Sequence, residues 1–367
     1  MSQLPYTVCF YCADQNRHRD RSRGITHYTY ELLSHLCEEN AVKLKAFVSK
    51  SSFAVPEGIE QVTWPFPSDR LHWRLFADHV HPFVVRRDVA DIWHYPKGFL
   101  PAGFQVRGKK VGTVADVMMQ FDADHHPESR PRLAWAYWLR TLKHSIQNFD
   151  LILTISEFSK QGIIEFCDRH RLKHPPIVVT SLGVEISQAD KSRSREKEDY
   201  VLHLASRLPH KATTWLLDQW ILLGQTTKNM PMLRLVGDLD ARGAALLSKM
   251  TNVSLTPPLP RTQLEEMIAG ARALLLPSWI EGFGIPAVES YLLGTPVAYV
   301  KGTAVEEILE NDPVGGFHRD FDSFRTALTQ VLNLDSATIE RKGTMLAERY
   351  TWENCVRSTL KAYRTVL

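Results

Sequence analysis

The strongest constraint on the fold is a repeated alternation of short apolar runs with segments whose apolar residues recur at helical spacing. Continuous apolar runs of this length are typical of strands in a parallel sheet that is covered on both faces. The first run is followed by 24–39, where Tyr28, Leu32 and Leu36 share one side of a helix and complete a βα unit. In the first half of the chain, the predicted strands are 6–12, 43–49, 91–96, 109–116 and 149–156.

The alternation stops at a polar, highly charged stretch, 187–198, and then restarts with strands that include 200–205, 232–238 and 296–300. A chain of 367 residues is too long for one ordinary core. We therefore predict an α/β fold with two doubly wound, Rossmann-like domains, 1–186 and 199–351, joined by the linker 187–198. Ligands of such sheets bind at the carboxyl ends of the strands, so two domains predict a central cleft.

The composition, with 44% hydrophobic and 23% charged residues, is typical of a soluble globular protein. No apolar run approaches the ~20 residues that a membrane span requires, and the first residues lack the pattern of a secretory signal. Five cysteines, an odd number, argue against a disulfide framework. We expect a cytoplasmic protein.

Cys9 and Cys12 form a C-x-x-C within the first predicted strand. No second ligand pair accompanies them, so buried thiols are favoured over a zinc or redox site. No metal is expected.

The net charge of +3 is too small to indicate nucleic-acid binding, but basic residues concentrate in 16–24 and 72–87. Such a face is able to contact anionic lipid headgroups or a phosphate-bearing acceptor, and a solvated surface is the alternative. One side of the predicted helix 131–149 carries four large apolar residues: Trp135, Trp138, Leu139 and Leu142. Packing in the core is favoured for them over insertion into a membrane surface.

The stretch 277–294, "PSWIEGFGIPAVESYLLG", leads from the end of an apolar strand into a helix. Gly282 and Gly284 lack a Cβ atom and let backbone N–H groups approach a ligand closely. Pro286 suits the first turn of the helix and Gly294 its end. The N-terminus of a helix therefore points toward the predicted cleft.

Such a helix end offers free N–H donors and about half a positive charge, which favours a diphosphate. A carboxylate in the loop, Glu281, is able to accept hydrogen bonds from sugar hydroxyls, and Glu289 in the helix matches the two hydroxyls of a ribose. Two ordinary surface glutamates beside a capped helix are the alternative. The combination of strand, E-G-F-G, proline and second glutamate favours a nucleotide-sugar site.

This stretch resembles the E-x7-E region of retaining glycosyltransferases of the family 4 type, which have the two-domain GT-B fold. The resemblance covers most of the chain, although the E-x7-E region is its specific part. Supporting segments occur in the family's order: "GITHYTYELL", "TISEFSKQGI", "SLGVE", "ASRLPHKA", "LRLVGD" and "GTPV". The resemblance also implies that the C-terminal helix, 352–367, packs back on the first domain.

Carried over residue by residue, the resemblance implies that Lys211 neutralises the donor diphosphate and that Glu281 contacts the donor sugar. Glu289 would bind the ribose. The family's partner arginine aligns with Ser206, so either Arg207, one position later, supplies the second positive charge or only one cation remains. The remaining donor-binding residues that we expect are Gly24, Ser206, Gly237, Gly282, Phe283, Gly284 and Ile285, with base selectivity around 237–239 and 257–261.

The chain departs from the family at 115–116, where Ala115-Asp116 replaces the His-Asp of many relatives. Asp116 and His94 are the residues that we expect on the acceptor side. His94, His125 or His126 would have to replace the missing histidine, and a structural or solvated role is the alternative for each of them.

Together with these residues, the resemblance implies a retaining, metal-independent hexosyltransferase that moves a mannose- or glucose-type sugar from a UDP- or GDP-linked donor. The acceptor would be a glycan or lipid-linked saccharide in bacterial-type polysaccharide biosynthesis, at the inner face of the membrane. No cofactor is expected, because Lys211 and the helix N-terminus supply the charge that a metal would otherwise provide. The alternatives are a degenerate domain that binds a nucleotide sugar or a partner enzyme without catalysis, and an epimerase or phosphorylase of the same fold. Nucleic-acid binding is not expected.

Overall fold

The structure, a computed structural model, describes residues 5–15, 23–50, 52–64, 90–101, 106–129, 131–187 and 196–367. The chain divides into two compact units. The first contains 1–117, 130–183 and 352–367, and the second contains 118–129 and 184–351. Most of the predicted linker and of the two basic stretches lies outside the described residues.

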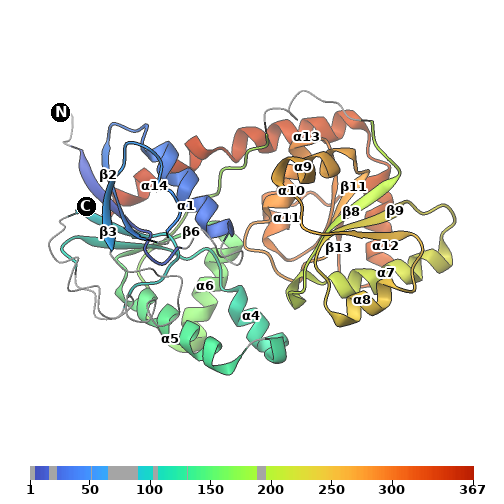
Figure 1. Ribbon diagram of the computed structural model, residues 1–367, viewed down its shortest axis with the longest axis horizontal. Coiled ribbons are helices and arrows are strands. Elements are labelled where there is room, and N and C mark those ends of the chain that lie inside the picture. Colours follow the sequence, from blue (N-terminus) through green and yellow to red (C-terminus); the bar gives the residue numbers. More distant parts are fainter. Residues whose placement is uncertain are drawn as a thin grey trace. The chain divides into compact units, whose positions relative to one another are not determined.

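The first unit is built around a parallel sheet of seven strands in the order β3-β2-β1-β4-β5-β6-β7 (Figure 1). The strands are β1 (Tyr6–Tyr11), β2 (Val42–Ser49), β3 (Glu60–Trp64), β4 (Ile92–Tyr95), β5 (Lys109–Thr113), β6 (Leu151–Thr154) and β7 (Ile177–Val179). Its helices are α1 (Arg23–Leu36), α5 (Arg132–Asn148), α6 (Glu157–His170) and α14 (Trp352–Tyr363). The crossover helices cover a sheet whose inner strands are buried, as continuous apolar runs require.

The core of the first unit lies between the sheet and the helices α5 and α6. In α5, Leu142 and Ile146 are buried, whereas Trp138 and Leu139 are only partly buried against this core. The prediction that Trp135 packs in the core is wrong: it is half-exposed and stacks on Trp138, with ring centroids 4.9 Å apart. The helix meets the sheet only along its C-terminal half.

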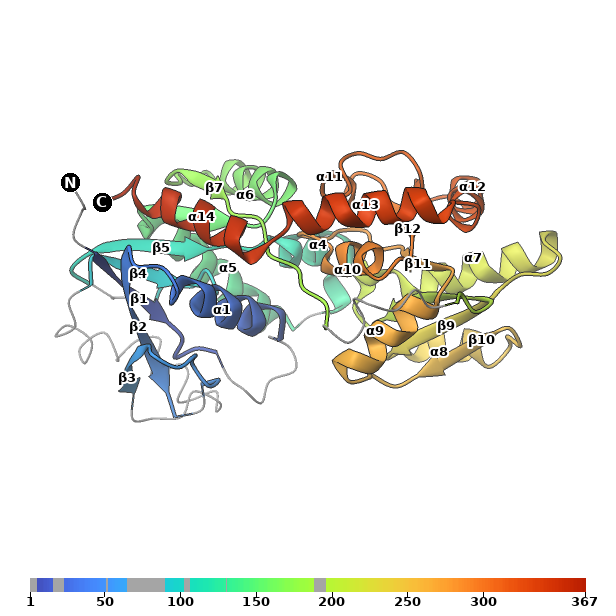
Figure 2. The same cartoon turned by 90° about the horizontal axis from the view of Figure 1, so that it is seen from above.

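On the opposite face of the sheet, α14 packs against α1, and the two helices lie side by side in Figure 2. The ring of Trp352 rests on Gly183, where a Cβ atom would come within 2.4 Å of the indole. Farther along α14, the Tyr363 hydroxyl lies 2.6 Å from Nδ1 of His94 in β4. The C-terminal helix therefore belongs to the core of the first unit.

The second unit is built around a parallel sheet of six strands in the order β10-β9-β8-β11-β12-β13. The strands are β8 (Tyr200–Ala205), β9 (Met232–Gly237), β10 (Val253–Thr256), β11 (Ala273–Leu276), β12 (Val297–Val300) and β13 (Gly316–Phe317). The helices are α4 (Met118–His125), α7 (Thr213–Thr226), α8 (Ala241–Leu247), α9 (Arg261–Gly270), α10 (Ile285–Leu292), α11 (Ala304–Ile308), α12 (Phe321–Leu332) and α13 (Ser336–Arg349), with 3₁₀ turns η2 (Pro127–Ser129) and η3 (Pro209–Lys211). Helices α7, α8 and α12 cover one face, where the main core lies, and Figure 1 shows α9, α10 and α11 over the other.

Two doubly wound parallel sheets confirm the predicted α/β class. One segment departs from the predicted domain boundaries. Residues 118–129, which the sequence analysis placed in the first domain, pack with the second unit. The physical reason is a buried contact in which Asp122 of α4 meets His210, with Oδ1 and Nδ1 2.9 Å apart.

Candidate functional site

Lys211 and Glu281 lie side by side although 70 positions separate them in the sequence. Lys211 ends the turn η3 that follows β8, and Glu281 follows β11, which pairs directly with β8. Parallel neighbours bring their carboxyl ends to the same edge of a sheet, so the two side chains meet there. The Nζ of Lys211 donates to Oε1 of Glu281 over 2.6 Å. The structure thus brings together the two principal residues that the sequence analysis singled out.

The Glu281 carboxylate is kept ionised inside the protein. Its burial alone would raise its pKa, but the Lys211 ammonium and hydrogen bonds from Lys211 and Ser278 lower the pKa below the usual value. Lysine carries three N–H donors, so one bond to Glu281 leaves donors for an anion. The Lys211 side chain is 29% exposed, compared with 11% for Glu281. The ammonium is therefore the member of the pair that solvent or a ligand reaches more easily.

The loop after Glu281 leads directly into the N-terminus of α10, which begins at Ile285 with Pro286 in its first turn. Gly284 caps the helix with φ of +91°, and a Cβ atom there would lie 2.6 Å from a methyl group of Val305. This position therefore requires glycine for the backbone conformation and for packing. The Phe283 side chain is buried edge-on against Tyr350, so only its backbone remains for a ligand.

Glu289 lies on α10 and is paired with Arg261, which the sequence analysis placed in the base-contacting segment 257–261 but not beside Glu289. The guanidinium of Arg261 donates to Oε1 of Glu289 over 2.6 Å, bonds Glu265 through Nε, and donates to the carbonyl oxygen of Glu185 over 2.8 Å. Both glutamate side chains are buried, whereas Arg261 is 46% exposed. A lone arginine at the start of a helix gives no sequence signal for a partner 28 positions away.

Three further residues of the predicted donor site lie near the carboxyl ends of β8 and β9. Gly237 has φ of +133°, and a Cβ atom there would be 2.1 Å from the Ala205 carbonyl oxygen, so the packing of the two strands already requires glycine. The backbone N–H of Ser206 donates to the Thr213 hydroxyl over 3.1 Å. Arg207 is largely exposed and lies 3.8 Å from Asp238, so its side chain is not fixed beside Lys211.

The predicted acceptor-side residues lie in the first unit, and one of them is unavailable to a ligand. His94 is wholly buried, with Nε2 2.7 Å from the Thr113 hydroxyl and Nδ1 2.6 Å from the Tyr363 hydroxyl. Its predicted role on the acceptor side is therefore wrong. Asp116 is half-buried just after β5, and Gly24 lies in the first turn of α1 rather than in a loop, with open space where its Cβ atom would be.

The two other histidines considered as replacements belong to the second unit, with α4. His125 is exposed and stacks on Phe121, with ring centroids 4.2 Å apart, and His126 lies 3.9 Å from Glu128. Both histidines thus contact residues of their own segment, and the replacement of the histidine that Ala115 lacks stays a prediction.

A further histidine, His203, links the two strands, β8 and β11, that lead to Lys211 and Glu281. His203, buried in β8, donates from Nδ1 to the Leu275 carbonyl oxygen over 2.9 Å, which leaves Nε2 to accept from the Thr213 hydroxyl over 2.9 Å. Burial lowers the pKa of His203 to about 4, and burial also lowers the pKa of His94 to about 3. Both rings are neutral at physiological pH.

Acidification will therefore reduce the free energy of unfolding between pH 6.5 and 4. Below pH 6.5 the unfolded chain protonates both histidines while the folded chain does not, so stability is present above this range and is lost as the pH falls. Each histidine will cost about 2 kcal/mol at pH 5. Urea unfolding at pH 7.5 and pH 5 will measure this loss, and His203→Gln will remove about half of it. Equal losses in the variant and the original chain would contradict the assignment.

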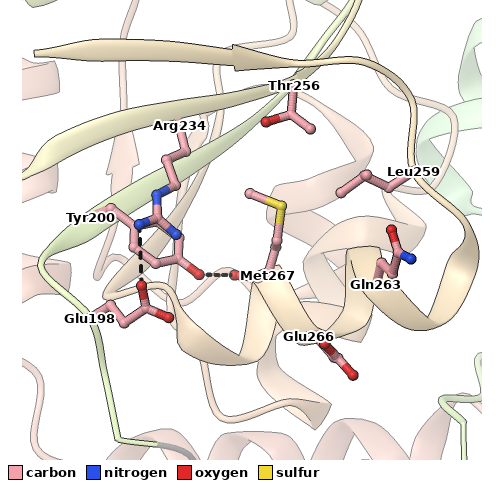
Figure 3. A pocket seen from close by; sticks show the side chains of 8 residues that line it. All are labelled: Glu198, Tyr200, Arg234, Thr256, Leu259, Gln263, Glu266 and Met267. Carbon is pink, nitrogen blue, oxygen red and sulfur yellow. Dashed lines mark hydrogen bonds and ion pairs between the residues drawn. The ribbon is translucent and has the colours of Figure 1, made fainter.

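A pocket of about 330 Å³ lies in the second unit, between α9 and the strands β8, β9 and β10 (Figure 3). The Arg234 guanidinium lies 3.8 Å from the ring centroid of Tyr200 and bonds Glu198, and the Tyr200 hydroxyl donates to the Met267 carbonyl oxygen. The full lining is Glu198, Tyr200, Arg234, Thr256, Leu259, Gln263, Glu266 and Met267. Leu259 belongs to the predicted base-contacting segment 257–261, but Lys211, Glu281 and Glu289 do not line the pocket. The ion pair, rather than this pocket, marks the candidate site.

The described part of the chain has neither a membrane-spanning helix nor a metal-binding cluster. No helix there is both long enough and apolar enough to cross a membrane. Among the same residues, no group of three or more histidine, cysteine, aspartate or glutamate side chains is placed to hold a metal ion. Cys9 and Cys12 are both buried thiols.

The chain is similar in sequence to known glycosyltransferases. Residues 199–333 match the family model described as Glycosyl transferases group 1. The chain is 26% identical to O-antigen chain mannosyltransferase B of Escherichia coli over 294 residues, which cover 76% of this chain and 75% of that protein. These matches support a glycosyltransferase.

Solved structures identify the fold. WaaG, a glycosyltransferase involved in lipopolysaccharide biosynthesis, aligns with a TM-score of 0.66 at 15% identity, covering 98% of this chain and 99% of WaaG. Anabaena Alr3699/HepE, solved with UDP and glucose, aligns with a TM-score of 0.65 at 16% identity, covering 98% of this chain and all of HepE. The chain has the GT-B fold.

Proposed function

We propose that the chain is a retaining, metal-independent glycosyltransferase that moves a hexose from a nucleotide diphosphate sugar to a hydroxyl of a glycan or lipid-linked saccharide. The observation that carries the proposal is the Lys211–Glu281 pair, located directly before the N-terminus of α10. An ammonium with spare donors and a helix end that favours anions are what a departing nucleoside diphosphate requires. The second carboxylate of the E-x7-E motif, Glu289, lies within α10 itself.

In the proposed reaction, the bond between the sugar C1 and the diphosphate oxygen breaks with both electrons remaining on the phosphate. The acceptor hydroxyl oxygen forms its bond to C1 on the same face, and its proton passes to the departing phosphate oxygen. Lys211 stabilises the charge that develops on the leaving group, while Glu281 holds the hydroxyls of the transferred sugar. The departing phosphate, rather than a histidine of the first domain, thus accepts the proton of the acceptor hydroxyl.

The donor class follows from the same site. In the E-x7-E resemblance Glu289 binds the ribose hydroxyls, and here Arg261 donates to Oε1 of its carboxylate. The mannosyltransferase relative favours a mannose donor, and the UDP and glucose in the HepE structure favour a UDP-linked glucose donor. We propose a mannose- or glucose-type sugar and a role in polysaccharide biosynthesis.

A matching donor will raise the unfolding temperature by about 5 to 10 °C at 100 times its dissociation constant, since such binding adds about 2.7 kcal/mol of stability. A thermal-shift series with UDP-, GDP- and ADP-linked sugars will identify the base and the sugar. The same series with EDTA, and then with added Mg²⁺ and Mn²⁺, tests metal independence. The donor that stabilises the protein should raise the unfolding temperature equally with EDTA, with Mg²⁺ and with Mn²⁺.

The stereochemistry needs its own measurement. NMR of the product formed from an α-linked donor should show an α-glycosidic linkage. A β-linked product would exclude retention while leaving sugar transfer itself intact.

A non-catalytic domain that binds a nucleotide sugar is the second candidate. Ala115 and Ser206 favour it, because they stand where many relatives of the E-x7-E type carry a histidine and an arginine. Donor hydrolysis without acceptor separates the two candidates. Slow release of nucleoside diphosphate indicates an enzyme, whereas donor binding without any release indicates the binding domain.

We also propose peripheral contact with an anionic membrane through the N-terminal half of α5, at the inner face of the bilayer. Leu133 is 86% exposed there, Tyr137 is 37% exposed, and the helix contains basic but no acidic residues. Interfacial helices combine these features. Co-sedimentation with phosphatidylglycerol vesicles tests the contact, and Leu133→Glu together with Tyr137→Glu should abolish it.

A further inference from the structure

The position of Lys211 depends on a short turn that cannot hold itself in place. The turn η3 contains only Pro209, His210 and Lys211, and it is followed by Ala212, whose φ of 52° lies in the left-handed region. Two backbone hydrogen bonds close the turn locally: the N–H of Lys211 donates to the Leu208 carbonyl oxygen, and the N–H of Ala212 donates to the Pro209 carbonyl oxygen. Groups outside the turn must therefore fix the direction of the Lys211 side chain.

His210 connects this turn to two other segments. Its carbonyl oxygen accepts a 2.7 Å hydrogen bond from the backbone N–H of Trp279, two positions before Glu281. Its ring lies 2.9 Å from Asp122 of α4. One residue thus links the turn that carries Lys211, the loop that carries Glu281 and a helix from a distant part of the sequence.

The contact between His210 and Asp122 is deeply buried. The Asp122 side chain has no exposed surface and that of His210 is 4% exposed. Since a carboxylate can only accept, Nδ1 of His210 must carry the hydrogen. Removing either partner would leave a buried polar or charged group without this bond, which forces the surrounding backbone to move.

Asp122 lies in a segment that is separated in sequence from the rest of the second unit. The flanking residues 1–117 and 130–183 belong to the first unit, but 118–129 pack with the second. The first half of the chain therefore contributes a short segment to the unit that holds Lys211 and Glu281. Asp122 is the buried polar residue of its helix.

We propose that Asp122 and His210 are a positioning pair, which holds the turn η3 so that Lys211 meets the departing diphosphate. The inference rests on the proposed function and extends it, since neither side chain needs to touch the donor. A displacement of about 1 Å at such a charge lowers catalysis by up to about a hundredfold. The segment 118–129 is then a part of the donor site rather than a connection between strands.

The test is a set of variants measured for nucleoside diphosphate affinity, with UDP and GDP as probes, and for the rate of sugar transfer. Asp122→Ala and His210→Ala should each weaken binding of the recognised diphosphate and lower kcat by about 10- to 100-fold. His210→Asn should retain most of the activity, because its amide nitrogen replaces Nδ1 as the donor to Asp122. His210→Gln places its nitrogen where Nε2 lies and should not rescue.

Two controls separate positioning from a general loss of stability. Tyr299→Phe removes the hydrogen bond from the hydroxyl of the buried Tyr299 to the Asp312 carbonyl oxygen, elsewhere in the second unit, and should lower stability without changing kcat. In a double-mutant cycle, Asp122→Ala should weaken diphosphate binding no further once Lys211 is alanine. A merely structural role would produce additive losses.

The outcomes distinguish this inference from the proposed function. If folded Asp122→Ala and His210→Ala proteins keep full affinity and kcat, or if the losses add to that of Lys211→Ala, the positioning role is refuted and the proposed function stands. If the original chain binds neither diphosphate and cleaves no donor, the proposed function fails, and the inference fails with it.

Discussion

Replacing Lys211 with alanine will lower the rate of sugar transfer at saturating donor by at least about a hundredfold, while the protein remains folded. A group that stabilises charge developing in the transition state is typically worth about 10²- to 10³-fold in kcat. Lys211 is the charged group best placed for this task, because it is joined to Glu281 at the carboxyl edge of the sheet. Product formation and release of nucleoside diphosphate measure the effect.

The same variant will also change Glu281. Without the ammonium, burial has more weight and the pKa of the Glu281 carboxyl rises, since Lys211 is the largest of the causes that lower it. We expect a loss of about 1 to 3 kcal/mol in unfolding free energy, because Lys211 is partly exposed and solvent screens part of the interaction. Circular dichroism and urea unfolding will separate this loss from the loss of rate.

Glu281→Gln provides the companion test, since it keeps the size of the side chain and removes its charge. Transfer should fall by a similar factor, because the sugar hydroxyls lose a charged acceptor. Lys228→Ala, which removes an exposed lysine of the same unit, should leave transfer unchanged. Near-normal turnover of both Lys211→Ala and Glu281→Gln would overturn the assignment of the site.

The sequence predicts the inner strands well and the edges poorly. The predicted strand 200–205 coincides with β8, which is buried along almost its whole length, and 232–238 ends one residue beyond β9, where Leu233, Leu235 and Val236 are buried. The edge strand β13 has two residues and β7 has three, so neither carries a pattern long enough to detect. Pairing with a neighbouring strand, rather than local sequence, forms these edges.

The candidate site was predictable where motif and topology agree. Lys211 and Glu281 each follow an apolar strand of the second domain, and a parallel sheet brings such positions to one edge. His94 shows the limit of this reasoning. It stands near a strand end in "WHYP", but Trp93, His94 and Tyr95 are all buried, and a strand covered on both faces gives no sign of which polar residue points inward.

Two contacts of the site had no signal in the sequence. Arg261 pairs with Glu289 on another helix, and Asp122 reaches His210 across 88 positions. Both are single charged residues without a local motif, and a charged residue is usually solvated. Only the packing of α4 and α9 against the rest of the second unit reveals their partners.

Replacing Glu289 with alanine will raise the donor KM by about 10- to 100-fold and leave kcat within about threefold. The ribose is remote from the bond that breaks, so its hydrogen bonds are equally strong in the bound donor and in the transition state. Removing them therefore weakens binding without slowing the chemical step. Initial rates over a range of donor concentrations measure both constants, and the nucleoside diphosphate product should lose affinity by the same factor.

Glu265→Gln is the matched control, because Glu265 shares Arg261 with Glu289 but lies on α9, away from the E-x7-E helix. Hydrogen bonds from Arg261 and Ser187 lower the pKa of the Glu265 carboxyl despite its burial, so its loss should reduce stability. The donor KM should stay within about threefold, since a neutral amide still holds Arg261 beside Glu289. If Glu265→Gln raises the KM as much as Glu289→Ala does, Arg261 rather than Glu289 recognises the donor, and the ribose role belongs to the guanidinium.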